Sequence, residues 1–483
     1  MHLDLKWIKL IINSVILIVC VVGTAILVWK TKFEDNNYRL LFILYTLCWI
    51  GPMILREYTS QIHTKMYKDD PIFSSLLWIP LSVYGIVGLF WKPLTDLLAY
   101  KFKSRKKVIY ISLIFQFVCY IPLFVYPCFT TNIIQSIGCG VGASIIGLFN
   151  LMFNEQHAKK RIFLTATLLS LPPLVAEFIS SVIQSLITSL IGANASNQEF
   201  IDITKWLWMI AIVFLVIAAL LAIFVKENRS LIYQDNKYRE PIKHSSEWTA
   251  LFFLCLIATI TSFTKFTTSG SASLTQLDFI ATKWWGKYSI NGYDGYLSVI
   301  FTIGQIAGNL LMGYIFSKKF SKLTMFIGST IIWMFYVLAV SSFGLLNPGL
   351  FMMLNILNGF AFGLIYNIIV SVILKKYFIK TNKITPISLY NTSLSLGIVA
   401  STWFNPWMKG EVFGEFNKFV DKMKDNETIP EQTWNKFVHV NWIVNIVVLV
   451  ALCLMIVLFI SALFLQKKNK LLSTIDPNKN ITN

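Results

Sequence analysis

Residues 226–247, KENRSLIYQDNKYREPIKHSSE, form the longest polar connection on one side of a chain that consists mostly of apolar runs. Six apolar runs precede this segment, at 39–62, 73–98, 108–127, 131–153, 162–191 and 205–226. Six more follow it, at 248–270, 292–316, 323–344, 348–374, 384–407 and 441–466. A run of about 20 apolar residues crosses a bilayer as a helix, and in lipid the backbone must pair internally. We therefore predict an all-α, polytopic membrane bundle of two six-helix halves.

One further apolar run, 9–29, precedes the first half. Its apolar core is long for a signal peptide, so we expect an extra N-terminal transmembrane helix whose N-terminus lies outside. The segments expected along the chain are an extra N-terminal helix (1–38), an N-terminal half (39–226), a central cytoplasmic loop (227–247), a C-terminal half (248–466) and a cytoplasmic tail (467–483).

The composition points to a membrane protein. Of 483 residues, 55% are hydrophobic and 14% are charged, and the mean hydropathy is +0.63. Such a chain has too few polar residues to cover a soluble fold, which excludes a soluble enzyme and a nucleic-acid-binding domain. The loops on one side of the predicted spans carry 27 Lys and Arg residues, against 12 on the other. By the positive-inside rule the richer side is cytoplasmic, so we expect a multi-pass protein of the cell membrane with a cytoplasmic C-terminus.

No metal site or cofactor is expected. The seven cysteines show neither paired nor metal-ligand spacing, and no phosphate-binding loop accompanies the spans. The expected partners are the lipid bilayer and a small anionic substrate, and we expect the protein to work as a monomer.

Two cations inside predicted spans suggest an anion site. Arg56 lies 17 residues after Arg39, and Lys265 lies 17 residues after Trp248, so both stand about 25 Å along the first helix of their half. A charge within a membrane needs a partner or a function. An anion between the two cations would supply both, and phosphate suits a guanidinium and an ammonium. Alternatively, both side chains snorkel to the outer interface, or Arg56 pairs with Glu57 or Glu177.

Three other charged residues stand out within the predicted spans. Glu177, after Pro172 and Pro173, could be a counter-ion of Arg56 that the substrate displaces, a proton carrier whose pKa is raised by burial, or an incidental buried acid. Lys92 and Asp96 stand one helical turn apart and could pair with each other. Alternatively, Lys92 adds a third cation at the mouth of the cavity.

The two halves share a basic turn after their second span. Lys92-Pro-Leu-Thr-Asp96 is followed by a basic loop at 100–107, and Gly308-Asn-Leu-Leu-Met-Gly313 by another at 317–322. This layout resembles the major facilitator superfamily, whose corresponding loop carries G-x-x-x-D-(R/K)-x-G-(R/K)-(R/K). Asp96 and the basic cluster are kept, and the glycines are replaced. The resemblance implies that Asp96, Lys101 and Arg105 stabilise one state of an alternating-access cycle. The simpler reading is a positive-inside loop with a helix-end cap.

Within that superfamily, the chain resembles the organophosphate:phosphate antiporters, which carry glycerol phosphate or hexose phosphate. Arg56 after Tyr45 and Trp49, Lys265 in the seventh helix of the twelve, and Tyr84-Gly85 twelve residues before Asp96 match that branch. The histidine of its fifth helix is absent. The resemblance implies exchange of a sugar phosphate or glycerol phosphate for inorganic phosphate. The side chains that could line the cavity and bind substrate hydroxyls, unless they serve packing, are Tyr45, Trp49, Tyr84, Tyr366, Tyr390 and Asn391.

Two other functions stay open. The first is a proton-coupled carrier of sugars, peptides, amino acids or drugs, in which Glu177 is essential. The second is a non-transporting membrane enzyme or scaffold, which would need a catalytic cluster near an interface. The five histidines are scattered at or beyond the ends of apolar runs, so we expect that the protein is not an enzyme.

Overall fold

The computed structural model describes residues 5–30, 37–67, 76, 78–157, 162–188, 197–227, 242, 245–269, 271–285, 293–377, 384–420 and 428–475. Most of the central loop 227–247 and the last eight residues of the tail lie outside these ranges. Helices cover nearly all of the described parts of the twelve spans of the two halves, which confirms the all-α bundle. Two of these spans are divided, 131–153 between two α-helices and 292–316 between an α-helix and a π-helix.

The helices follow one another in two groups. The first group comprises α2 (Asn37–Met66), α4 (Trp78–Phe102), α5 (Arg105–Val125), α6 (Phe129–Ser144), α7 (Ile146–His157), α8 (Ile162–Thr188) and α9 (Asn197–Phe224). The second comprises α11 (Ser245–Thr268), α12 (Ser271–Trp285), α13 (Tyr293–Leu311), η2 (Met312–Phe316), α14 (Ser317–Lys319), α15 (Lys322–Ser342), η3 (Phe343–Leu346), α16 (Pro348–Tyr377), α17 (Pro386–Val420) and α18 (Glu431–Ile475).

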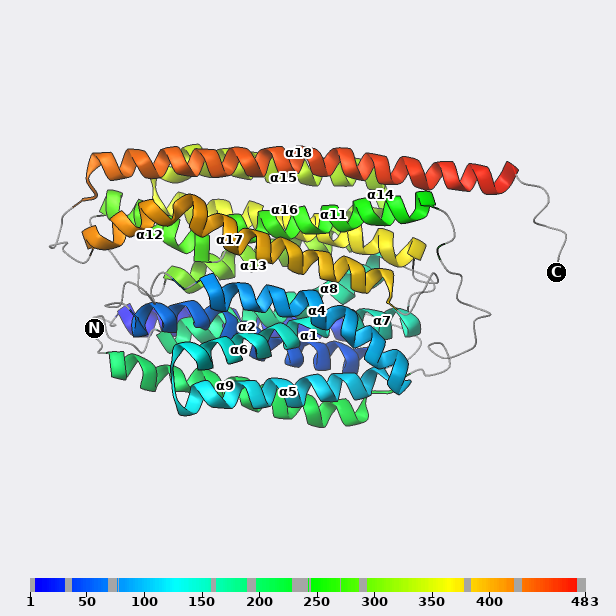
Figure 1. Ribbon diagram of the computed structural model, residues 1–483, viewed down its shortest axis with the longest axis horizontal. Helices are drawn as coiled ribbons and strands as arrows, with labels where there is room; N and C mark the ends of the chain where they lie inside the picture. The colour runs from blue at the N-terminus through cyan, green and yellow to red at the C-terminus, as the bar shows by residue number, and fades with distance from the viewer. Residues whose placement is uncertain are drawn as a thin grey trace.

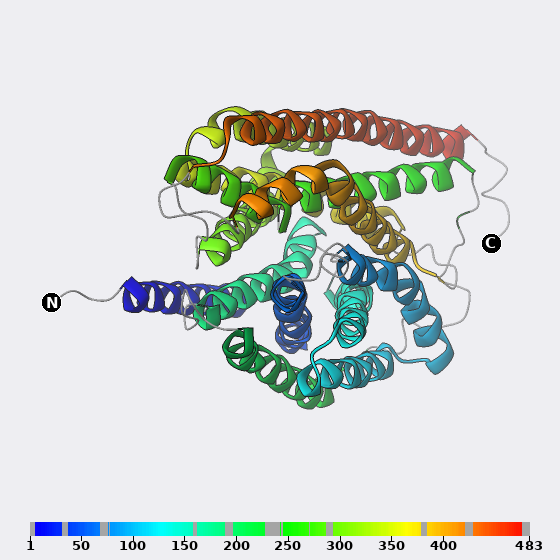
Figure 2. The ribbon, with the colours of Figure 1, turned by 60° about the vertical axis from the view of Figure 1, so that its left-hand side comes forward.

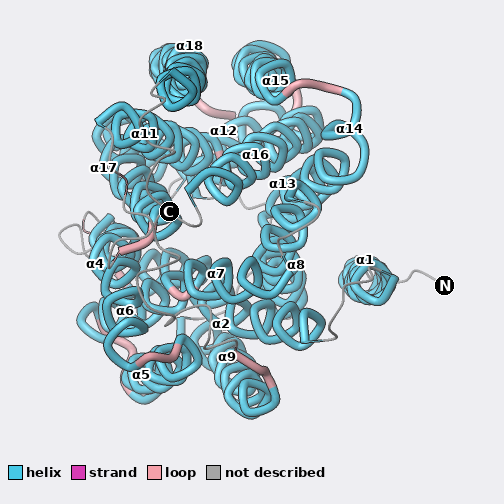
Figure 3. The backbone as a smooth tube through the Cα atoms, turned by 90° about the vertical axis from the view of Figure 1, so that its right-hand side faces the viewer, coloured by secondary structure: helices cyan, strands magenta, loops and turns pink. Residues whose placement is uncertain are grey.

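These groups form two bundles that lie side by side with their helices roughly parallel (Figure 1). The end-on view places α4 against α17 along one seam between the bundles and α8 against α13 along the other (Figure 3). The turned view shows the same division, with the first group below the second (Figure 2). The two seams bring residues far apart in the sequence into contact at the middle of the molecule.

Ten helices of the described residues are long and apolar enough to cross a membrane. Three helices on predicted spans, α1, α4 and α17, fall outside that group, and the apolar part of α1 is shorter than the others. The helices α4 and α17 differ for another reason. Both carry buried polar side chains, among them Lys92 and Asp96 on α4 and Asn391 on α17. Because these groups face the other bundle rather than lipid, they lower the apolar character of the two helices without exposing polar atoms to the membrane.

Glycines let helices approach closely at these contacts. A Cβ atom at Gly88 would overlap the hydroxyl of Ser395, so the absence of a side chain allows α4 to lie against α17. A Cβ atom at Gly363 would overlap the backbone of Gln305, which fixes α16 against α13. Small residues serve this purpose in membrane helix packing generally.

The last two long outer loops of the prediction contain helices. The loop 270–291 includes α12, and the loop 408–440 includes the end of α17 and the start of α18. The ring of Phe279 stacks on Phe416 and Phe437, at centroid distances of 3.9 and 4.3 Å. Ion pairs, including Lys436 with Glu411 at 2.7 Å, surround this aromatic core. The two segments were predicted to be polar loops. Their aromatic residues instead form a packed cluster that lengthens the second bundle at this end.

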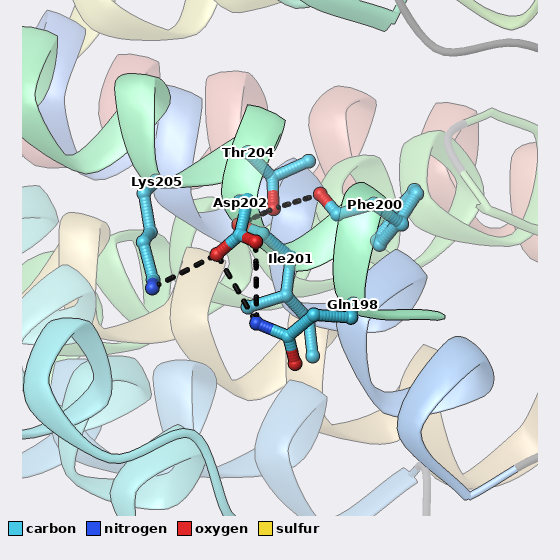
Figure 4. Close-up of polar contacts among 6 residues, drawn as sticks. All are labelled: Gln198, Phe200, Ile201, Asp202, Thr204 and Lys205. Atoms are coloured by element: carbon cyan, nitrogen blue, oxygen red, sulfur yellow. Dashed lines mark hydrogen bonds and ion pairs between the residues drawn. The ribbon is translucent and has the colours of Figure 1, made fainter. Parts of the chain in front are cut away.

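The start of α9 shows how such an outer end begins. Asp202 accepts hydrogen bonds from Gln198 at 3.2 Å and from Lys205 at 3.1 Å within the first turns (Figure 4). Thr204 donates to the backbone carbonyl of Phe200 at 2.7 Å. Acids near the first turn of a helix also interact favourably with its dipole.

The helix α1 (Leu5–Lys30) lies outside the two bundles, next to α8 (Figure 3). Its Ile16 and Leu17 pack against Phe178 and Val182 of α8 and Val299 of α13. It therefore covers the α8–α13 seam. That this helix is retained as an extra membrane span stays a prediction.

Candidate functional site

The two cations singled out in the sequence meet at one aromatic ring. The Arg56 guanidinium carbon lies 5.0 Å from the ring centroid of Phe266, and the Lys265 ammonium lies 5.6 Å from the same centroid. Arg56 comes from α2 of the first bundle and Lys265 from α11 of the second. The structure therefore brings together one cation from each half, in the parts of both helices that are predicted to lie toward the outside.

Hydrogen bonds between neighbouring helices hold this arrangement. Ser180 and Gln184 of α8 donate to the carbonyls of Ile50 and Ile54 on α2, at 3.2 and 2.7 Å. These bonds fix α8 beside the turn of α2 that precedes Arg56. On the other side, Asn405 of α17 donates to the carbonyl of Phe266 at 3.3 Å.

Glu177 pairs with Lys265 rather than with Arg56. Each carboxylate oxygen of Glu177 lies 3.4 Å from the Lys265 ammonium, and the two side chains are 17% and 12% exposed. The sequence analysis had offered Arg56 as the partner of Glu177, and the arrangement of the helices explains why Lys265 is the partner instead. Glu177 lies on α8, which borders the second bundle along one seam, and the chain order does not reveal that seam.

Aromatic rings surround the Lys265 ammonium. It lies 4.8 Å from the ring centroid of Phe362 and 5.4 Å from that of Phe301. The Arg56 guanidinium lies 5.3 Å from the ring of Tyr84. Cations gain electrostatic stabilisation from aromatic faces, so these rings support charges that a membrane would otherwise disfavour.

The other aromatic residues predicted to line the cavity lie in two groups, one in each bundle. The ring of Tyr366 stacks near Phe362 at 5.9 Å, and Tyr390 follows at 6.3 Å from Tyr366. On the first bundle, Tyr45 lies 6.2 Å from Trp49. All of them sit in the interior between or within the two bundles, and Trp49 is 9% exposed.

Lys92 and Asp96 reach across the α4–α17 seam instead of pairing with each other. The Lys92 ammonium donates to the Asn391 carbonyl at 2.7 Å and to the Ser395 hydroxyl at 2.6 Å. The Asp96 carboxylate accepts from the amide and the hydroxyl of Thr385, at 2.9 and 2.6 Å. Because Thr385 precedes the first residue of α17, Asp96 caps that helix from the other half.

The other two proposed conformational residues differ in burial. Arg105 is buried, its backbone amide donates to Glu227, and it interacts electrostatically with Asp96. Lys101 is exposed at the end of α4. Only Arg105 therefore joins Asp96 at the seam.

A network of uncharged side chains connects the two bundles along the α8–α13 seam. The sequence pattern did not single out these residues. Asn367 of α16 donates to Thr167 of α8 at 2.7 Å and to Asn309 of α13 at 2.6 Å. Asn309 also donates to the Thr167 carbonyl at 3.1 Å. The available signal was the position of Asn309 in Gly308-Asn-Leu-Leu-Met-Gly313, which parallels Lys92 in the first half.

The comparisons with known proteins place this architecture in a family. The profile of the Major Facilitator Superfamily matches residues 40–402, three quarters of the chain. This chain belongs to the Major Facilitator Superfamily. Membership means that the protein is a membrane transporter and not an enzyme. No curated protein matches the chain in sequence.

Two solved structures share this major facilitator fold. The human organic anion transporter MFSD10 (TETRAN) is 11% identical, with a TM-score of 0.56 over 90% of this chain and all of that chain. The Escherichia coli fucose:proton symporter FucP is 14% identical, with a TM-score of 0.57 over 89% of this chain and 98% of that chain. At these identities the likeness establishes the fold alone. Neither comparison indicates the organophosphate branch.

Several polar groups in the interior of this major facilitator protein have no hydrogen-bond partner within the described residues. They include the hydroxyls of Tyr45 and Tyr390 and both polar atoms of the Asn391 side chain. Sequence reasoning missed Gln305, whose two amide atoms are also unpaired, because one glutamine in an apolar run carries no pattern. The described residues contain no cluster of three or more His, Cys, Asp and Glu side chains that could hold a metal ion.

Proposed function

We propose that this major facilitator protein is a secondary transporter that carries a small anionic metabolite, bound between Arg56 and Lys265, by alternating access. The observation that supports this proposal is the approach of both cations to the ring of Phe266. Two like charges beside the same ring repel each other more strongly in a poorly hydrated interior than in water. An anion between them removes that repulsion and replaces part of the lost hydration.

The finer proposal concerns the cargo. A phosphate group accepts two parallel hydrogen bonds from a guanidinium and attracts the point charge of an ammonium. We therefore propose a sugar phosphate or glycerol phosphate, exchanged for inorganic phosphate, as the cargo pair. Exchange of one phosphate for another needs no separate coupling ion.

In this proposal Glu177 is the counter-ion of Lys265 in the absence of cargo. An anion that approaches Lys265 competes with the carboxylate for the same ammonium, 3.4 Å away. Because Glu177 belongs to α8 and Lys265 to α11, exchange of one partner for the other changes the contact between the two halves. The cargo thereby gains a way to alter the equilibrium between conformations.

The experiment uses proteoliposomes that contain the full chain and are loaded with inorganic phosphate. Labelled glycerol 3-phosphate or glucose 6-phosphate is added outside, and counterflow is measured. We expect counterflow in the wild type and its loss in Arg56→Gln and in Lys265→Gln. Lys436→Gln is the matched control, because Lys436 also pairs with carboxylates but lies at the outer end of α18.

Two results would count against the proposal. Full counterflow in Lys265→Gln would exclude the cation pair as the binding site. Counterflow of small carboxylates, but of no phosphate ester, would reject the phosphate cargo and keep the anion site.

The ion pair favours one alternative mechanism, a proton-coupled carrier. Protonation of the partly exposed Glu177 would release Lys265 just as an anion would. In that case an imposed pH gradient drives uptake in the wild type, and Glu177→Gln abolishes this accumulation but keeps exchange. One of the two solved structures with this fold is described as an organic anion transporter and the other as a fucose:proton symporter, so both an anionic cargo and proton coupling occur on this architecture.

A further inference from the structure

We infer that this transporter recognises the hydroxyl groups of its cargo through five neutral side chains, Tyr45, Asn150, Gln305, Tyr390 and Asn391, here named the inner polar layer. The inference rests on the proposed anion site at Arg56 and Lys265. It deepens that proposal by adding Asn150 and Gln305 to the expected hydroxyl-binding residues Tyr45, Tyr390 and Asn391, and by placing the hydroxylated body of the cargo between the cations and the predicted cytoplasmic side.

The members of the inner polar layer are buried polar residues whose hydrogen-bonding capacity is unused. Tyr45 is 2% exposed, Asn150 is 1% exposed, and Gln305, Tyr390 and Asn391 are 0% exposed. Each has at least one side-chain polar atom without a hydrogen-bond partner in the described part of the chain. Buried polar groups in folded proteins are normally paired, and an unpaired one costs about 1–3 kcal/mol. Five such residues therefore need an explanation.

A continuous path of rings connects this layer to the cation pair. The Lys265 ammonium contacts Phe362, whose ring lies 5.9 Å from Tyr366, and Tyr366 lies 6.3 Å from Tyr390. The backbone of Gln305 lies against Gly363 of α16, the residue next to Phe362. In this inference, a molecule held by its charged end at Lys265 lies along these rings in the cargo-bound conformation and reaches the layer.

The short helix α7 brings the rest of the layer together. The ring of Phe149 stacks on Tyr45 at 4.6 Å, and Asn150 is the next residue. On the same helix, a Cβ atom at Gly147 would lie 3.5 Å from the amide nitrogen of Asn391. Tyr45 of the first bundle and Asn391 of the second thus approach α7 from two sides.

The chemistry of the layer selects a class of ligand. None of the five side chains carries a charge, so they do not bind a second acidic group strongly. Carboxamides offer both a donor and an acceptor, and phenols do the same. A hydroxyl group is also both donor and acceptor, and a row of hydroxyls can satisfy a row of such side chains. The neighbouring ring faces of Phe362 and Tyr366 suit the apolar C–H side of a polyol.

Other buried glutamine and tyrosine side chains in the same protein do form hydrogen bonds, so burial alone does not leave these residue types unpaired. Gln135, also 0% exposed, donates to the Leu55 carbonyl at 3.2 Å and accepts from Trp208 at 2.6 Å. The buried Tyr336 hydroxyl donates to the Asn355 side chain at 3.2 Å. The fold satisfies Gln135 and Tyr336 by itself but leaves Gln305 and Tyr390 without partners.

The test compares ligands that differ only in hydroxyl groups, as inhibitors of counterflow in proteoliposomes with the full chain. The two pairs are glycerol 3-phosphate with propyl phosphate, and glycerate with propionate. We expect the hydroxylated member to inhibit at a concentration at least about tenfold lower, because one hydrogen bond is worth roughly that factor. In Gln305→Leu and Asn391→Leu, this ratio falls to about twofold or less, while inhibition by propyl phosphate stays the same.

Thermal unfolding of the same variants separates recognition from folding. Gln135→Leu and Tyr336→Phe remove satisfied hydrogen bonds, so both lower the melting temperature and keep the hydroxyl preference. Gln305→Leu and Tyr390→Phe remove unpaired atoms, so they leave the melting temperature unchanged or raise it.

The outcomes distinguish this inference from the proposed function. If no anion inhibits or is exchanged, the proposed anion site itself is wrong. If both members of each pair inhibit equally in the wild type, or if Gln305→Leu keeps the hydroxyl preference, the anion site stands and the inner polar layer is not a recognition site.

Discussion

The Lys265 ammonium lies 3.4 Å from both carboxylate oxygens of Glu177, and this ion pair connects the two halves of the protein. Lys265 belongs to α11 of the second bundle and Glu177 to α8 of the first. Since the halves of a major facilitator protein move relative to each other, an ion pair between them is sensitive both to cargo and to conformation.

Removal of the Glu177 charge tests this sensitivity. In Glu177→Gln the Lys265 ammonium loses its carboxylate, and a cation left in a mostly buried site is destabilising. We expect a lower melting temperature without ligand and a larger upward shift on addition of the anionic cargo, which then meets no competitor. A thermal-shift titration measures both. Equal ligand shifts in the wild type and Glu177→Gln would mean that Glu177 does not compete with the cargo.

The contact between Asp96 and Thr385 predicts a conformational effect. A hydrogen bond to a charged group contributes about 1.5–3 kcal/mol, so its loss in Asp96→Asn or Thr385→Val should shift the conformational equilibrium about tenfold or more. Hydrogen–deuterium exchange at the predicted cytoplasmic ends of α4 and α17 should rise in both variants. The exposed residue Lys101 provides the control, because Lys101→Gln should leave exchange unchanged.

The turn between α4 and α5 predicts a stabilising substitution. Lys103 has a φ angle of 49°, a left-handed conformation that costs a side-chain-bearing residue about 1–2 kcal/mol. Glycine adopts it without that cost. We expect Lys103→Gly to raise the melting temperature, and Lys107→Gly, within the helix α5, to lower it. A lower melting temperature for Lys103→Gly would show that the lysine side chain stabilises the turn by other contacts.

Lys409 predicts a dependence of stability on pH. It lies beyond the predicted span 384–407, is 2% exposed, and its ammonium has no hydrogen-bond partner among the residues that the structure describes. Burial lowers the pKa of Lys409 to about 8. The folded protein therefore binds fewer protons than the unfolded chain between pH 8 and about 10.5, so stability should rise with pH across that window. Below pH 8 both states are protonated and this contribution is constant.

Replacement of Lys409 should remove this behaviour. We expect the free energy of unfolding of Lys409→Met at pH 7 to exceed that of the wild type by an amount on the order of 3 kcal/mol, and its stability to lack the rise above pH 8. Lys436→Met is the matched control, because Lys436 is partly exposed and paired with Glu411 and Glu415. A pH profile of Lys409→Met that coincides with the wild type would contradict the assignment.

The sequence by itself determined the class of fold and the positions of its helices. Apolar runs long enough to span a bilayer leave few alternatives to helices, since the backbone must satisfy its own hydrogen bonds in lipid. The central polar segment divided these runs into two sets of six. Arg56, Lys265 and Glu177 were recognisable for the same reason, because a charge in such a run is costly wherever its helix lies.

Only the tertiary structure decided which of these residues meet. The periodicity of a membrane helix does not tell its lipid-facing side from the side that faces another helix when both are apolar. The pairing of Glu177 with Lys265, the reach of Lys92 to Asn391, and the unpaired amide of Gln305 all depend on the two seams between the bundles. These contacts join residues far apart in the chain, so their partners follow from how the helices pack and not from their spacing along it.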